Sequence, residues 1–108
     1  MKITMTSNPS PDAVEDRVSV GDVKKYEIDP APWLVGKGTI ESVLWHIESG
    51  FAAINDTGLS ALITFNQSGR TLITITITTS TGEKKKLWLK VRSVDRNLYV
   101  DDYGMNHG

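Results

Sequence analysis

The sequence predicts an all-β protein built as a single antiparallel β-sandwich. The first observation is composition, since the chain holds eleven Thr, nine Val, nine Ile and eight aromatic residues but only five Ala. β-Branched and aromatic side chains favour strands, whereas Ala favours helices. The second observation is that alternating apolar and polar runs are separated by turn residues about every 8 to 12 residues. The third is that no segment shows a helical period.

Length, charge and the lack of cysteine limit what this chain does. Its 108 residues suffice for one domain, which we place at residues 12–93, between an N-terminal arm (1–11) and a C-terminal tail (94–108). Without cysteine there are no disulfides and no thiolate metal sites. A formal net charge of −1 gives no general attraction to nucleic acid or to an anionic membrane, so we expect neither as a partner.

The polar N-terminal arm precedes two expected edge strands. The arm carries Pro9 and Pro11 and lacks the apolar run of a signal peptide. We therefore expect it to lie outside the core, and we expect no secretion signal. The edge strands are expected at residues 17–20 and 23–28, on either side of a Gly-Asp turn. The two prolines of residues 29–32 end this section because proline cannot donate to a strand ladder.

Residues 39–48 are predicted to form a strand anchored by an inward tryptophan. The inward positions are Val43, Trp45 and Ile47, and the outward positions are Ser42, Leu44, His46 and Glu48. A short strand is expected at residues 51–54, a turn at 55–58 and a further strand at 59–66. The inward positions of that further strand are Leu59, Ala61, Ile63 and Phe65.

The strongest strand pattern covers residues 72–79, with Ile73, Ile75 and Ile77 inward and Thr74, Thr76 and Thr78 outward. Because this run is flat, uncharged and free of proline, it would aggregate at a sheet edge, so we expect a central strand. A hairpin leads to the next strand, 85–91, with Leu87, Leu89 and Val91 inward and Lys86, Trp88, Lys90 and Arg92 outward. We interpret Arg70 and residues 83–86 as charged gatekeepers against aggregation rather than as a phosphate site.

These seven or so strands fit an Ig-like antiparallel β-sandwich. No pattern in the sequence indicates catalysis, a cofactor or a metal site. Of the two histidines, His46 lies at an outward position in mid-strand and His107 lies near the end of the tail. Neither is placed beside a nucleophile as a general base would be. We therefore expect a protein that is not an enzyme.

Apolar residues at outward positions indicate a binding role. If the three clearest strands are neighbours in one sheet, Leu44, His46 and Trp88 share its outer face with the threonine stripe. An exposed tryptophan with apolar neighbours is typical of an interaction hot spot, and a tryptophan covered by the chain's own arm is the alternative. The C-terminal tail also holds more apolar side chains than a purely solvated tail needs. The candidate protein-interaction residues are Leu44, His46, Trp88, Leu98, Tyr99 and Tyr103.

Three motifs in a fixed order carry a resemblance to a known family. They are D-x-x-x-W-L at residues 29–34, T-I-x-S-V-x-W at 39–45 and T-x-T-I-T-T-x-x-G at 74–82. In this order they resemble the small Ig-like proteins of tailed bacteriophages that act as fiber–tail adaptors, and the last motif is also similar to PKD-type and bacterial Ig-like modules. The proline-rich bend at 29–32 and the long C-terminal tail depart from the phage pattern. The resemblance implies a non-enzymatic virion protein and transfers no binding residues.

We therefore expect a structural protein of a tailed-phage virion, an adaptor that joins tail or portal components to fibers through its arms and outer sheet face. Its expected partners are tail, portal or fiber chains in a symmetric assembly of several copies. Its expected location is the virion, assembled in the host cytoplasm. Two alternatives stay open: a head decoration (cement) protein of the same fold, and a carbohydrate-binding module in which Trp33 or Trp88 stacks on a sugar of the host surface.

Overall fold

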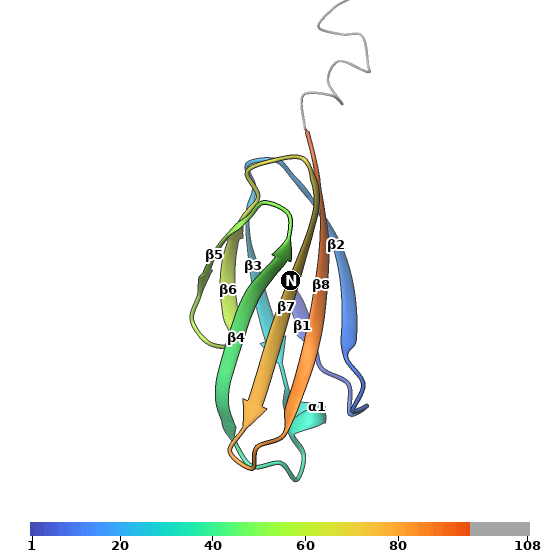
Figure 1. Cartoon of the computed structure of the whole chain (residues 1–108), viewed down its shortest axis with the longest axis vertical. Coiled ribbons are helices and arrows are strands. Elements are labelled where there is room, and N and C mark those ends of the chain that lie inside the picture. The colour runs from blue at the N-terminus through green and yellow to red at the C-terminus, as the bar shows by residue number, and fades with distance from the viewer. Residues whose placement is uncertain (96–108) are drawn as a thin grey trace, which may run out of the picture.

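A computed structural model describes residues 1–95 and confirms the predicted all-β sandwich (Figure 1). Within these residues the chain forms eight strands and one short helix. They are β1 (Lys2–Thr4), β2 (Asp12–Ser19), β3 (Val23–Asp29), α1 (Ala31–Leu34), β4 (Ile40–Ser49), β5 (Ala53–Asp56), β6 (Ser60–Thr64), β7 (Gly69–Thr79) and β8 (Lys84–Val94). The strands form two four-stranded sheets. Sheet 1 has the order β1-β3-β6-β5 and sheet 2 the order β2-β8-β7-β4.

The inward residues of the two sheets make one core. The largest contributions come from the alternating strands that the sequence predicts, whose inward residues Ala61, Ile63, Phe65, Ile73, Ile75, Ile77, Leu87, Leu89 and Val91 are all buried. As expected, β7 is a central strand, since it lies between β8 and β4. Trp45 is also buried, and its Nε1 donates a hydrogen bond to the Gly58 carbonyl oxygen at 2.7 Å. This bond satisfies the indole N–H inside the sandwich.

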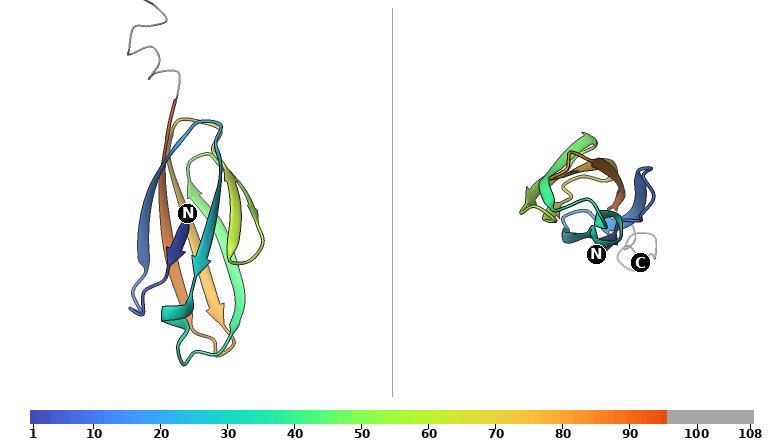
Figure 2. Two further views of the ribbon diagram at one scale, coloured as in Figure 1. Left: turned by 180° about the vertical axis from the view of Figure 1, so that it is seen from behind. Right: turned by 90° about the horizontal axis from the view of Figure 1, so that it is seen from below.

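Two of the strand pairings are parallel, which the prediction of a purely antiparallel sandwich missed. β1 pairs in parallel with β3, and β2 pairs in parallel with β8 (Figure 2). The remaining pairings, β3 with β6, β5 with β6, β4 with β7 and β7 with β8, are antiparallel. The exceptions are the two N-terminal strands. Neither is tied to its partner by a hairpin, so turn geometry does not impose the antiparallel direction on them.

The N-terminal arm is not outside the core, so that expectation is wrong. Ile3 and Met5 are buried, with exposed fractions of 3% and 0%. The Met5 amide donates to the Asp29 carbonyl oxygen at 2.9 Å, which extends the pairing of β1 with β3. The chain then crosses to sheet 2 through residues 6–11. A strand of only three residues gives a weak sequence pattern, and the two prolines at positions 9 and 11 suggested an irregular segment. Proline removes a hydrogen-bond donor only at its own position, so these prolines do not prevent residues 2–4 from pairing with β3.

Directly after β3 the chain forms a helical turn, α1, at residues 31–34, where the sequence predicts only that the prolines end the strand. In α1 the Leu34 amide donates to the Pro30 carbonyl oxygen at 2.9 Å, and Trp33 is buried. Proline is tolerated here because the first N–H groups of a helix have no partner within it. Other boundaries differ from the predicted ones: β2 begins at Asp12 rather than at residue 17, β5 covers 53–56 rather than 51–54, and β8 runs to Val94, past the boundary set at residue 93.

Candidate interaction surface

Sheet 2 places the predicted interaction residues of its strands on one outer face. β4, β7 and β8 are neighbours, as expected. In their register Trp88 lies opposite Thr74, and Thr74 lies opposite His46. Leu44 lies opposite Thr76 in the next row. The structure therefore brings together the three candidates in β4 and β8, while Leu98, Tyr99 and Tyr103 lie outside the described residues.

Two large apolar side chains project from this face on either side of the threonine stripe. Leu44 is 63% exposed and Trp88 is 41% exposed. Between their strands the Thr74 hydroxyl donates to the Glu48 carboxylate at 3.0 Å, and His46 Nε2 lies 3.8 Å from the same oxygen. Glu48 thus links β4 to β7. We define Leu44, His46 and Trp88 as the apolar patch. Its strands belong to a four-stranded sheet in which β4 shifts register against β7 between Ile40 and Ser42 and again between Ile47 and Ser49.

Trp33 and Trp88, the two tryptophans considered for stacking on a sugar, have opposite environments. Trp33 is only 3% exposed, so its expected availability for stacking is wrong. Lys37 covers this site, since its Nζ donates to the Trp33 carbonyl oxygen at 2.8 Å and lies 5.4 Å from the centre of the ring. Trp33 belongs to the core because the turn of α1 directs it inward. Trp88 is 41% exposed and is therefore available to a partner.

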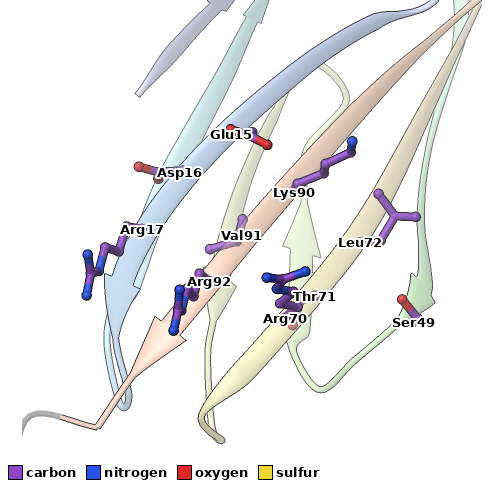
Figure 3. A pocket seen from close by; sticks show the side chains of 10 residues that line it. All are labelled: Glu15, Asp16, Arg17, Ser49, Arg70, Thr71, Leu72, Lys90, Val91 and Arg92. Carbon is purple, nitrogen blue, oxygen red and sulfur yellow. The ribbon is translucent and has the colours of Figure 1, made fainter.

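Basic side chains predominate on the outer face of β2, β8 and β7. Outward positions on these three strands hold Arg17, Arg70, Lys84, Lys86, Lys90 and Arg92, against a single acidic residue, Glu15. Three of them, Arg17, Arg92 and Arg70, lie in one cross-strand row and line an open hollow (Figure 3). Sequence reasoning missed this row because its members are distant in the chain, and only the strand register brings them together.

Lys85 is not a surface gatekeeper, in contrast to the interpretation of residues 83–86. Its side chain is fully buried, whereas Lys84 and Lys86 are exposed. Its Nζ lies 3.0 Å from an Asp12 carboxylate oxygen and donates to the Thr6 carbonyl oxygen at 2.8 Å and to the Asn8 carbonyl oxygen. In the alternation of β8, Lys85 points inward, as Leu87 and Leu89 do. Its amine therefore reaches the backbone of the N-terminal segment at Thr6 and Asn8.

Two carboxylates of the edge strand β2, those of Asp12 and Asp16, have pKa values lowered by their contacts. Burial by itself raises the pKa of Asp12, but hydrogen bonds from Thr6 and Lys85 and the Lys85 charge outweigh it and hold the pKa below its usual range. The same balance lowers the pKa of Asp16, which accepts hydrogen bonds from Lys24 Nζ at 2.6 Å and from the Tyr26 hydroxyl at 2.7 Å. Burial and the Asp16 charge raise the pKa of Tyr26. Asp16 thus links the two sheets.

The Asp16 contacts predict an acid-dependent loss of stability. A carboxyl whose pKa is lowered by folding stabilises the protein above its unfolded pKa of about 3.9, and this contribution disappears as the pH falls through the folded pKa. At pH 7 we expect Asp16→Asn to lower the free energy of unfolding by about 2 kcal/mol, because hydrogen bonds to a charged acceptor are lost. The difference from wild type should shrink below about pH 4, as measured by urea denaturation between neutral and acidic pH.

A matched control for this prediction is Asp56→Asn, because Asp56 is an exposed carboxylate at the end of β5. Like Asp16→Asn, Asp56→Asn removes one negative charge, but it does not break a contact between the two sheets. A difference between wild type and Asp16→Asn that stays constant down to pH 2.5 would contradict the assignment of this stability to the ionised carboxylate.

Comparison with known structures places the fold among Ig-like sandwiches of the PKD type. A PKD domain from KIAA 1837 protein superposes with a TM-score of 0.57 at 18% identity, over 82% of this chain and 84% of that one. PbICP-C, from its complex with falcipain-2, superposes with a TM-score of 0.52 at 10% identity, over 86% and 98%. A 2,6-sialyltransferase of Vibrionaceae Photobacterium sp. JT-ISH-224 matches 80% of this chain with a TM-score of 0.61 at 10% identity.

The chain spans only 18% of the length of that sialyltransferase. No protein-family model matches the sequence, and no curated protein matches it. At these identities the structural similarities show the fold alone. They confirm the expected similarity to PKD-type Ig-like modules at the level of fold, and the resemblance to phage adaptors stays a prediction.

Residues 1–95 were also compared with the features of membrane spans and metal sites. None of their helices is long and apolar enough to cross a membrane. They contain no group of three or more His, Cys, Asp or Glu side chains that could hold a metal ion. His46 is exposed on the outer face of sheet 2, and His107 lies outside the described residues.

Proposed function

We propose that this chain is a non-enzymatic interaction module whose partner binds the outer face of sheet 2. The observation that carries this proposal is the apolar patch, in which Leu44 and Trp88 project from the outer face of sheet 2 with exposed fractions of 63% and 41%. Clustered apolar side chains on a rigid surface are typical of protein-interaction sites, and tryptophan is enriched at the residues that contribute most to binding.

The proposed setting is the virion of a tailed bacteriophage, where the module would join tail or portal components to fibers. The support is the ordered resemblance of residues 29–34, 39–45 and 74–82 to fiber–tail adaptors. Two of these motifs contribute to the proposed surface, because residues 39–45 lie at the start of β4 and residues 74–82 include the second half of β7. A head decoration protein of the same fold would use the same surface, and the number of copies per particle separates the two roles.

We expect Leu44→Ser combined with Trp88→Ser to reduce incorporation into particles by about tenfold or more, because both apolar contacts with the partner are lost. The measurement is quantitative mass spectrometry of purified particles of the phage that encodes the chain, reported as copies per particle. The matched control is Val23→Ser combined with Leu62→Ser. These residues are 61% and 45% exposed, and they face outward from β3 and β6 in sheet 1.

Three outcomes would contradict the proposal. Absence of the wild-type chain from particles would exclude a virion role, and equal loss in the control variant would remove the special role of sheet 2. A saturable change in tryptophan fluorescence when the isolated monomer is titrated with glycans would favour the carbohydrate-binding alternative. Trp88 would be the source of that change, because Trp33 and Trp45 are buried.

A further inference from the structure

Three arginines form a compact row on the outer face of sheet 2. Arg17 of β2 lies opposite Arg92 of β8, and Arg92 lies opposite Arg70 of β7. All three side chains are exposed, and Figure 3 shows them side by side near the ends of these strands, with Lys90 farther along β8. Because neighbouring strands are about 4.8 Å apart, the three attachment points span only about 10 Å. We call these three residues the arginine row.

The pair of Arg92 and Arg70 in this row opposes sheet pairing rather than supporting it. Like charges directly opposite one another on neighbouring strands are destabilising. In the part of the chain that the structure describes, no ion pair compensates Arg70 or Arg92. The neighbouring row differs, since there Glu15 lies opposite Lys90. The concentration of positive charge is also local, because the whole chain has a formal net charge of −1. An anionic ligand would compensate the charges of Arg70 and Arg92.

We propose that the arginine row binds an acidic segment of the partner protein through its Asp or Glu carboxylates. The inference rests on the proposed function, because it assigns a second part of the same outer face to the same partner. A guanidinium group binds a carboxylate through two parallel hydrogen bonds, which gives this pair both strength and a defined direction. An extended segment presents alternate side chains about 7 Å apart, so two of its carboxylates can contact one row of three arginines.

The surroundings of the row favour a protein over a nucleic acid. Leu72 lines the same hollow and offers an apolar contact beside the charges. Trp88 lies on the same face of β8 as Arg92, four residues earlier, or about 13 Å along the strand. Tryptophan and arginine are the residue types most enriched at protein-interaction hot spots. The net charge of the chain gives no long-range attraction to a polyphosphate backbone.

The test is fluorescence anisotropy with labelled probes and the full-length protein. The probes are a peptide of alternating Glu and Thr, the same peptide with Gln in place of Glu, and an oligothymidylate with the same number of negative charges as the Glu peptide. We expect wild-type protein to bind the Glu peptide and not the Gln peptide. Arg70→Thr combined with Arg92→Thr should weaken binding about tenfold or more. In urea denaturation this variant should be as stable as wild type or slightly more stable, because two opposed like charges are removed from exposed positions.

The matched control is Lys84→Thr combined with Lys86→Thr, which removes the same charge from the other end of the same sheet face. We expect it to weaken binding by less than about threefold, because those lysines lie beyond a Debye length from the row. Equal weakening by both variants, tighter binding of the oligothymidylate, or no binding of the Glu peptide would each overturn the proposal.

Incorporation into particles separates this inference from the proposed function. If Leu44→Ser with Trp88→Ser lowers incorporation and Arg70→Thr with Arg92→Thr does not, the arginine row has no role and the proposed function stands. If none of these variants lowers incorporation, both proposals fail. If both variants lower it while the two controls do not, the partner contacts both parts of the face.

Discussion

Replacing Lys85 with Met is expected to destabilise the protein by about 3 kcal/mol, because the partly buried carboxylate of Asp12 would lose its positive partner. Two carbonyl oxygens, of Thr6 and Asn8, would also lose their hydrogen-bond donor. Methionine fills a similar volume, so the loss would report the polar contacts rather than a cavity. The measurement is the free energy of unfolding from urea denaturation at neutral pH.

The neighbouring lysines provide the control for this substitution. Lys84→Met and Lys86→Met change the same residue type one position away, at exposed sites of β8. We expect each to change the free energy of unfolding by no more than about 0.5 kcal/mol. A small effect at Lys85, or an equal effect at all three positions, would show that the buried amine does not hold the N-terminal segment.

Replacing both inward residues of the N-terminal segment, Ile3→Ala with Met5→Ala, is expected to cost about 4 kcal/mol or more, since each removes a large buried side chain and leaves a cavity. The outward residues of the same segment give the control, Lys2→Ala with Thr4→Ala, for which we expect less than about 1 kcal/mol. Urea denaturation of the two double variants makes the comparison. If both double variants changed the free energy of unfolding equally and only slightly, residues 1–5 would be an arm outside the core.

Strand β8 shows how stability and binding are separated in this fold. Its inward positions carry Lys85 and the core residues, while its outward positions carry Trp88 and Arg92. Because successive side chains of a strand point to opposite faces, substitutions on the outer face can change binding without opening the core. The variants proposed for the apolar patch and the arginine row therefore test binding in a folded protein.

Local pattern predicted much of the sandwich and the apolar patch. The alternation of Ile and Thr identified β7 as a central strand with a threonine stripe, and the phase of Trp45 placed Leu44 and His46 outside. The N-terminal strand escaped prediction because Lys2, Ile3 and Thr4 give too short an alternation to stand out beside Pro9 and Pro11. The helical turn at Trp33 escaped it because a single turn has no period to detect.

By itself the sequence determined the fold class, the inward and outward faces of the long strands, and the residues that form the apolar patch, because side-chain alternation is local information. Only the tertiary structure decided which strands are neighbours, which pairings are parallel and which residues lie opposite one another. The arginine row, the contacts of Lys85 and the burial of Ile3 all depend on those long-range choices. They follow from burying one core between two sheets, a condition on the whole chain that no short segment encodes alone.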